Sequence, residues 1–307
     1  MSNSRDQNWW PPPLRHATVV DRRGVVTGAA AALCFLAGTG GLARAGGRSR
    51  PIRFGLTPVF LDNDLELLDA LKSYFETATG MAVRLVQRRT YQEITSLLIS
   101  GQLDAAWICG YPFVANRARL SLVAVPVWRG RPLYQSYLIV AKDREGRSIE
   151  DLAGDIHAFS DPNSNSGFLV TRALLAERGL KPANFFSRTF FTYGHRNVVR
   201  AVASGLAQSG SVDGYVWEVL AKSEPDITAP TRVLRRSEWL GFPPVATSRT
   251  LAGSASVRVL RDALLNMHES KAGQRVLALL GLDGFHSEDE RLFDTIAAKV
   301  ELVRRLG

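Results

Sequence analysis

The chain has 307 residues, of which 46% are hydrophobic and 22% charged, and its formal net charge is +9. This composition is typical of a soluble globular protein with one large or two modest domains. The basic residues are scattered along the chain without an aromatic-interleaved patch, so we expect no nucleic-acid partner.

The first 45 residues have the features of an export leader. Arg22-Arg23 precedes a weakly apolar run from Gly24 to Ala37, and Ala43-Arg44-Ala45 supplies a small-x-small cleavage signal. The apolar run falls short of the roughly 20 residues that span a bilayer. We therefore predict a twin-arginine-type signal peptide over residues 1–45, a periplasmic location and no stable membrane insertion after cleavage. Cleavage would leave Cys109 as the only cysteine, which excludes an intramolecular disulfide.

The first half of the remaining chain alternates between strands and helices. We predict strands at 52–57, 81–87 and 103–108, with helices at 62–79 and 91–101 between them. Thr90-Tyr91-Gln92-Glu93 has the spacing of a capping box, so Tyr91 lies in the first turn of the second helix. The third strand delivers Cys109 to the same edge of the sheet. Tyr91 and Cys109 are therefore expected to face one crevice.

The second half contains another series of strands and helices. We predict strands at 122–127, 134–141, 157–160 and 185–191, and helices at 148–152, 166–178 and from 195 onward. Return strands at 233–234 and 243–247 flank a hinge at Gly241-Phe242-Pro243-Pro244, and helices at 255–267, 271–279 and 288–306 end the chain. The pattern predicts an α/β, two-lobed fold with a hinge and a ligand cleft. Lobe 1 would comprise residues 46–140 plus 243–307, and lobe 2 residues 141–242.

A polar loop at Asp161-Pro162-Asn163 leads into the helix that begins near Ser166. A helix start leaves amide hydrogens without partners and carries the positive end of the helix dipole, so it attracts anions. Ser164, Asn165 and Ser166 add neutral donors that can surround the oxygens of a tetrahedral oxyanion. The loop therefore predicts an anion cradle. The alternative is that Ser164 or Ser166 only caps the helix.

Three blocks carry a family resemblance. Asp161 to Val170 reads D-P-N-S-N-S-G-F-L-V, which resembles the ligand loop D-P-x-S-x-S-G of the PhnD-like periplasmic binding proteins for phosphonate, phosphite and phosphate. Tyr91 to Ile94 and Gly101 to Trp107 are similar to the family's Y-x-x-I and G-x-x-D-x-A-W. Gly194 to Val202 is similar to its G-H-x-x-x-x-x-A-V block. The resemblance covers most of residues 52 to 285 and implies the type II periplasmic-binding-protein fold.

The resemblance also implies roles for single residues. It places Tyr91 and His195 against the ligand, although Tyr91 could merely pack and His195 could merely cap its helix. It makes Asp213 the acceptor of a proton from a protonated oxyanion, which would select singly protonated phosphorus ligands over sulfate. Glu218 is a further candidate with a similar role, although its spacing differs from the family pattern.

The implied function is capture of a small phosphorus oxyanion by hinge closure. An ABC permease would recognise the closed form. We expect the binding protein to act as a monomer. The sequence speaks against an enzyme, because it lacks a G-x-S-x-G elbow, an H-E-x-x-H metal motif and a phosphate loop. We therefore predict no catalytic residues, no metal site and no cofactor.

Cys109 departs from the phosphonate-binding pattern. Phosphonate binders carry W-Y-G-N where this chain has Trp107-Ile108-Cys109-Gly110-Tyr111. Relatives that sense arsenite use a cysteine in this region, since trivalent arsenic bonds to thiolate sulfur. The alternative function is therefore a periplasmic arsenite sensor that signals to a sensor kinase. A buried structural cysteine that behaves as a small hydrophobic residue is the simpler interpretation.

Overall fold

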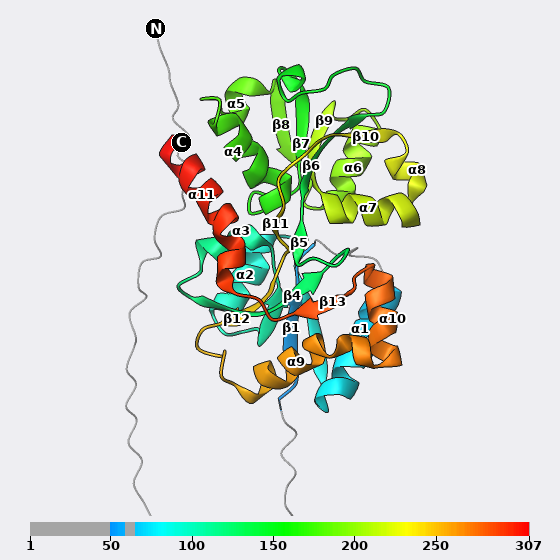
Figure 1. Ribbon diagram of the computed structural model, residues 1–307, viewed down its shortest axis with the longest axis vertical. Helices are drawn as coiled ribbons and strands as arrows, with labels where there is room; N and C mark the ends of the chain where they lie inside the picture. Colours follow the sequence, from blue (N-terminus) through cyan, green and yellow to red (C-terminus); the bar gives the residue numbers. More distant parts are fainter. Residues whose placement is uncertain (1–49, 59–64, 307) are drawn as a thin grey trace, which may run out of the picture. The chain divides into compact units, whose positions relative to one another are not determined.

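The computed structural model describes residues 50–58 and 65–306, and Figure 1 shows the arrangement of their helices and strands. The signal peptide predicted over residues 1–45 lies outside this part of the chain. Within the described ranges, the search for a helix long and apolar enough to cross a membrane finds none.

Two mixed sheets organise the described residues, and we refer to each sheet with its helices as a lobe. The first sheet has the strand order β13-β4-β12-β3-β1-β2. Its strands are β1 (Ile52–Leu56), β2 (Val83–Gln87), β3 (Ala105–Trp107), β4 (Leu120–Val127), β12 (Val245–Ser248) and β13 (Gly284–His286). β1 pairs in parallel with β2 and β3, whereas β12 runs antiparallel to β3 and β4. Its helices are α1 (Leu65–Thr79), α2 (Tyr91–Ile99), α3 (Gly110–Ala115), α9 (Ala255–Leu265) and α10 (Lys271–Leu280).

The second sheet has the order β10-β6-β9-β7-β8. Its strands are β6 (Ser136–Ala141), β7 (Ile156–Phe159), β8 (Arg188–Phe191), β9 (Ser209–Asp213) and β10 (Thr231–Arg236). β7 pairs in parallel with β8 and β9, so the carboxyl ends of these three strands meet at one edge. Its helices are α4 (Val170–Ala176), α5 (Pro182–Phe185), α6 (His195–Ala203), α7 (Gly214–Ser223) and α8 (Pro225–Thr228).

The chain crosses between the two sheets twice. β5 (Leu133–Tyr134) and β11 (Leu240–Gly241) form an antiparallel pair that lies on these crossings. β6 belongs to the second sheet, so we propose that the boundary between the lobes falls near Gln135 and near Phe242. The last helix, α11 (Asp294–Leu306), packs against α3 of the first lobe and α4 of the second (Figure 1).

Local side-chain chemistry explains where the helices near the cleft begin. The capping box predicted for α2 is confirmed: the Glu93 amide donates to Thr90 Oγ1 over 3.2 Å, and the Thr90 amide donates to the Glu93 carboxylate over 3.0 Å. Asp213 caps α7 by accepting the Tyr215 amide over 2.9 Å. Each cap satisfies amides that the first helical turn leaves free.

Several elements differ from the sequence-based expectation. The strand predicted at 185–191 begins at Arg188, because Pro182 starts the short helix α5 that ends at Phe185. The helix α3, which begins directly after Cys109, was not predicted. The short helix predicted at 148–152 is confirmed as η1 (Glu150–Leu152). The helix predicted from Ser166 begins with the π-helical η2 (Asn165–Leu169), and the one predicted at 288–306 begins with η4 (Glu290–Phe293). The short helix η3 (Met267–Glu269) was not predicted as a separate element.

Candidate ligand-binding site

Seven of the eight predicted ligand-binding residues are buried where the two lobes meet. Each exposes at most 2% of its surface, and together they are Tyr91, Cys109, Ser164, Asn165, Ser166, His195 and Asp213. They come from α2, the end of β3, the loop after β7, the start of α6 and the end of β9. Hydrogen bonds connect members from different lobes, so the residues form one cluster, which we call the interlobe cluster.

The loop after β7 is shaped by local contacts. Ser164 is the N-cap of η2, and its Oγ accepts the Gly167 amide over 3.0 Å. Gly167 is required here, because an added Cβ would lie 1.9 Å from Ser160 Oγ. The first turn after the cap is a π-turn, a form that recurs at functional sites. Capping, the alternative interpretation, therefore applies to Ser164 but leaves Asn165 and Ser166 available.

Three polar atoms of this loop have no well-formed hydrogen bond within the part of the chain that the structure describes. They are Ser160 Oγ, Asn165 Oδ1 and Ser166 Oγ, and all three are buried. Ser166 lies beside Asp213 and Tyr134. A buried polar group without a partner costs about 1–3 kcal/mol, so such groups indicate a site whose partner is a ligand or water.

His195 is a neutral hydrogen-bond donor in this arrangement. Its Nδ1 accepts the Asp213 backbone amide over 3.1 Å, so in the neutral ring the proton is on Nε2. Burial lowers the pKa of His195 to about 3, which keeps the ring neutral at physiological pH. Nε2 lies 3.2 Å from Tyr91 Oη and donates to it, so the Tyr91 hydroxyl hydrogen is free to point at a ligand.

The carboxyl group of Asp213 is about half protonated at neutral pH. Burial raises its pKa to about 7, although the amides of Val216 and Tyr215 and the Ser166 hydroxyl act in the opposite direction. Among the described residues, no cationic group is a cause of the pKa shift of Asp213. The carboxyl group can therefore share a single proton with an oxyanion. The carboxylate would accept the proton of a protonated ligand, and the carboxylic acid would donate to a deprotonated one.

The lobes are joined through residues of the cluster. The Asn165 amide donates to Cys109 Sγ over 3.2 Å, and Asn165 Nδ2 donates to Tyr134 Oη over 2.8 Å. The amide of Tyr91 in the first lobe donates to Asp161 Oδ2 in the second over 3.2 Å. Sequence reasoning missed Tyr134 and treated Asp161 only as a turn residue. Asp161 was the first residue of the family loop, whereas no pattern around Tyr134 marked it.

Cys109 lies inside the cluster as a protonated thiol. Burial raises its pKa to about 12, while the backbone amides of Asn165 and Tyr111 bond to the sulfur and act in the opposite direction. Among the described residues, no group of three or more His, Cys, Asp or Glu side chains could hold a metal ion.

Glu218 has partners of its own in the structure. Its Oε1 accepts the Tyr137 hydroxyl over 3.0 Å and its Oε2 pairs with Arg129 over 2.9 Å. The residue lies in the second turn of α7, and these two partners already occupy the carboxylate. The structure therefore does not bring Glu218 into the interlobe cluster.

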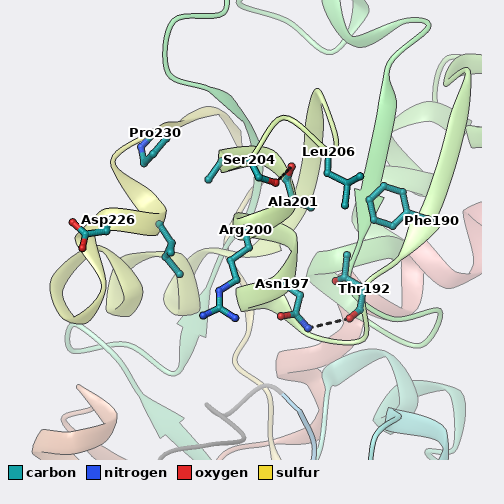
Figure 2. A pocket seen from close by; sticks show the side chains of 11 residues that line it. Phe190, Thr192, Asn197, Arg200, Ala201, Ser204, Leu206, Asp226 and Pro230 are labelled. Atoms are coloured by element: carbon teal, nitrogen blue, oxygen red, sulfur yellow. Dashed lines mark hydrogen bonds between the residues drawn. The ribbon is translucent and has the colours of Figure 1, made fainter.

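A separate cavity of about 550 Å³ lies in the second lobe (Figure 2). Its lining includes Phe190, Asn197, Arg200, Leu206 and Asp226, and none of the predicted ligand-binding residues. It is wide open to solvent. We take the interlobe cluster as the candidate site, because that is where buried unpartnered donors and acceptors converge.

Comparison with known proteins identifies the family. Residues 54–292 match the family model described as "ABC transporter, phosphonate, periplasmic substrate-binding protein". The chain belongs to this family. Its members are substrate-binding components of transporters and not enzymes, and the periplasm is the location that the family implies.

Curated relatives and solved structures agree with this assignment. The chain is 29% identical over 154 residues to the phosphate-import protein PhnD of Mycolicibacterium smegmatis, which is 46% of this chain and 48% of that one. It is 26% identical over 222 residues to the phosphonates-binding periplasmic protein of Escherichia coli, or 70% and 65% of the two chains. The matches thus span about half to two thirds of these relatives.

Solved structures confirm the two-lobed type II fold. A binding protein component of an ABC phosphonate transporter from Pseudomonas aeruginosa superimposes with a TM-score of 0.77 at 24% identity, covering 83% of this chain and 87% of that one. PhnD1 from Prochlorococcus marinus in complex with methylphosphonate gives a TM-score of 0.71 at 19% identity, covering 83% and 97%.

Proposed function

We propose that this protein captures a small phosphorus oxyanion, such as phosphite, phosphate or a phosphonate, and delivers it to an ABC permease. One observation carries the proposal. Buried polar groups from both lobes meet around Ser166 Oγ and Asn165 Oδ1, and neither atom makes a well-formed hydrogen bond within the described residues. His195 donates to Tyr91 Oη, so the Tyr91 hydroxyl is available as a donor to the ligand.

The charge of the site favours a ligand that carries a proton. The cluster contains the carboxyl groups of Asp161 and Asp213, and none of its hydrogen bonds among the described residues involves a lysine or arginine. A fully ionised dianion would meet repulsion without a compensating cation. A monoanion that offers one proton to Asp213 meets less repulsion and gains a hydrogen bond.

Hinge closure is the mechanism that the arrangement supports. The β5 and β11 crossings connect lobes whose facing residues form the site. A ligand that bonds Ser166 of one lobe and Tyr91 of the other interacts fully only when the lobes are closed, so it shifts the population toward that state. The closed form, acting as a monomer exported to the periplasm, would then be recognised by the permease.

Calorimetric titration with phosphite, phosphate, methylphosphonate and sulfate tests the function. We expect binding of at least one phosphorus oxyanion and no comparable binding of sulfate at pH 8. Ser166→Ala should weaken binding about 10- to 100-fold, because one hydrogen bond to a charged group contributes about 1.5–3 kcal/mol. Ser223→Ala, on the exposed face of α7, is the matched control. Equal affinities of the two variants would contradict the proposed site.

Arsenite sensing through Cys109 and a sensor kinase is the second candidate. The observation that favours it is the position of the thiol inside the cluster, in contact with the Asn165 amide. The raised pKa of Cys109 disfavours a free thiolate, so arsenic would have to displace the thiol proton on bonding. Titration with arsenite before and after Cys109→Ser separates the candidates. If the wild type binds arsenite but no phosphorus oxyanion, and Cys109→Ser no longer binds arsenite, the ligand is arsenite and not a phosphorus oxyanion.

A further inference from the structure

A strained turn follows β4 in the first lobe. Trp128 and Arg131 exchange backbone hydrogen bonds across it. The two residues between them, Arg129 and Gly130, both have positive φ, 53° and 73°. Asn, Asp or Gly usually occupies the first central position of such a turn, because a positive φ strains other residues. An arginine at this position therefore indicates that its side chain has a role.

The Arg129 side chain reaches the other lobe, where it pairs with Glu218 of α7 over 2.9 Å. Each partner is anchored in its own lobe. In the turn, the Gly130 amide donates over 2.7 Å to Asp283, which directly precedes β13 of the first sheet. On α7, Glu218 accepts the hydroxyl of Tyr137, a residue of β6 in the second sheet, over 3.0 Å. The ion pair thus joins two supported elements that belong to different lobes.

Neighbouring contacts join the same part of the two lobes. The Tyr215 hydroxyl on α7 donates to the Leu280 carbonyl in the last turn of α10, where helical carbonyls lack partners within the helix. The Tyr215 ring also meets the Trp128 ring edge-on, and the Arg129 guanidinium lies over the Trp128 ring at 4.5 Å from its centroid. Tyr215 and Glu218 are three residues apart, so they lie on one face of α7. This face contacts the first lobe through residues that are not part of the interlobe cluster.

The same helix carries part of the candidate ligand site. Asp213, a member of the interlobe cluster, caps α7 through the amide of Tyr215. The bonds that join the lobes within the cluster and the ion pair of Glu218 are present in one conformation. A rotation that moves α7 away from the first lobe would therefore break this ion pair together with the cluster.

We propose that Arg129 and Glu218 form a latch that stabilises the closed lobes and so raises ligand affinity without touching the ligand. The inference rests on the proposed function, because it concerns the closed state in which the ligand is captured. An ion pair at the surface shifts an equilibrium by up to about 5-fold. The latch therefore adjusts the population of the closed state, and the ligand remains the main driver of closure.

A double-mutant cycle, read by calorimetric titration with phosphite, phosphate and methylphosphonate, tests the latch. Arg129→Asn suits the turn and removes the cation, so it should weaken binding about 2- to 5-fold without lowering the urea midpoint of unfolding. Glu218→Gln should weaken binding to a similar extent, and the double variant no further, because each change removes the same ion pair. Arg178→Asn, which removes an ion pair with Glu150 inside the second lobe, is the matched control and should bind like wild type.

The outcomes separate the latch from the function on which it rests. If the wild type binds a phosphorus oxyanion and Arg129→Asn binds it equally tightly, Arg129 forms no latch, although the proposed function stands. If Glu218→Gln has much the larger effect and the two effects multiply in the double variant, Glu218 contacts the ligand and the latch is wrong.

If the wild type binds none of the three oxyanions, the proposed function fails, and small-angle scattering of the ligand-free protein decides on the latch. Arg129→Asn should then still enlarge the open population relative to wild type and Arg178→Asn. A scattering curve of Arg129→Asn that coincides with both would contradict the latch.

Discussion

At the scale of single residues, the interlobe cluster depends on protonation states that burial sets. Asp213 and His195 are adjacent in the structure, and burial moves their pKa values in opposite directions, to about 7 and about 3. In both cases burial favours the uncharged form, because the neutral acid and the neutral base need less solvation. The site therefore presents fixed neutral donors together with one carboxyl group that titrates near physiological pH.

The titration of Asp213 predicts how discrimination against sulfate depends on pH. Above pH 7 the ionised carboxylate repels sulfate, which brings no proton, whereas below pH 7 the protonated carboxyl can donate to it. We expect sulfate to compete with phosphite weakly at pH 8 and measurably at pH 5.5. Asp213→Asn cannot ionise, so it should bind sulfate about equally at both values. Competition titrations at the two pH values measure this, and pH-independent competition in the wild type would contradict the role of Asp213.

The same carboxyl group predicts a change in the stability of the ligand-free protein. Because the folded pKa of Asp213 is raised, the folded state binds the extra proton between about pH 4 and 7, and stability is lost as the pH rises through that window. Asn keeps the oxygen that caps α7 without the charge. Asp213→Asn should therefore be more stable than wild type at pH 8, by on the order of 2–4 kcal/mol, and about equally stable at pH 4. Urea denaturation at both pH values measures the difference.

At the scale of elements, Asp161 joins the loop after β7 to the start of α2. Oδ1 accepts the Asn163 amide over 2.7 Å within the turn, and Oδ2 accepts the Tyr91 amide of the other lobe. An asparagine has one side-chain oxygen, so Asp161→Asn can keep the turn but not both bonds. We expect a larger open population and about 5- to 20-fold weaker binding, since closure must then be driven by the ligand. Small-angle scattering of the ligand-free variant measures the opening.

A matched change sharpens that prediction. Asn163→Ala leaves the backbone amide that Asp161 accepts, so it should preserve both the turn and the bond between the lobes. We expect the scattering curve of Asn163→Ala to coincide with that of wild type. If the curve of Asp161→Asn coincides with it as well, the bond from Tyr91 does not hold the lobes closed.

Elements were predictable from sequence where the signal is local. The capping box at Thr90 and Glu93 is carried by four consecutive residues, and the structure confirms it. The family and the two-lobed fold were likewise predicted and are confirmed by the family match and the structural relatives. Tyr134 escaped notice because its contact with Asn165 depends on how the lobes pack, and no spacing rule encodes that contact. For Glu218, a motif spacing cannot show that Arg129 and Tyr137 bond its carboxylate, so its role at the ligand stays a prediction.

At the scale of the whole molecule, two buried histidines couple folding to pH. His157 lies in the core of the second lobe, 2.8 Å from both Ser209 Oγ and Ser211 Oγ and stacked on Phe186, and burial lowers its pKa to about 3. His195 has a pKa lowered to a similar value between the lobes. Both take up a proton on unfolding at any pH between about 3 and 6.5. The stability that these histidines contribute is therefore fully present above pH 6.5 and is lost as the pH falls.

In the wild type, the pH dependence of the free energy of unfolding that comes from the histidines is partly cancelled. Asp213 releases a proton on unfolding over much of the same pH range. In the Asp213→Asn background the opposing group is absent, so the free energy of unfolding should fall more steeply between pH 6 and 4.5. The steeper slope should approach that of two protons taken up, or about 2.7 kcal/mol per pH unit from the two histidines. Equal slopes with and without Asp213 would mean that the carboxyl and the histidines do not titrate in opposition, and the charge balance inferred for the cleft would then be wrong.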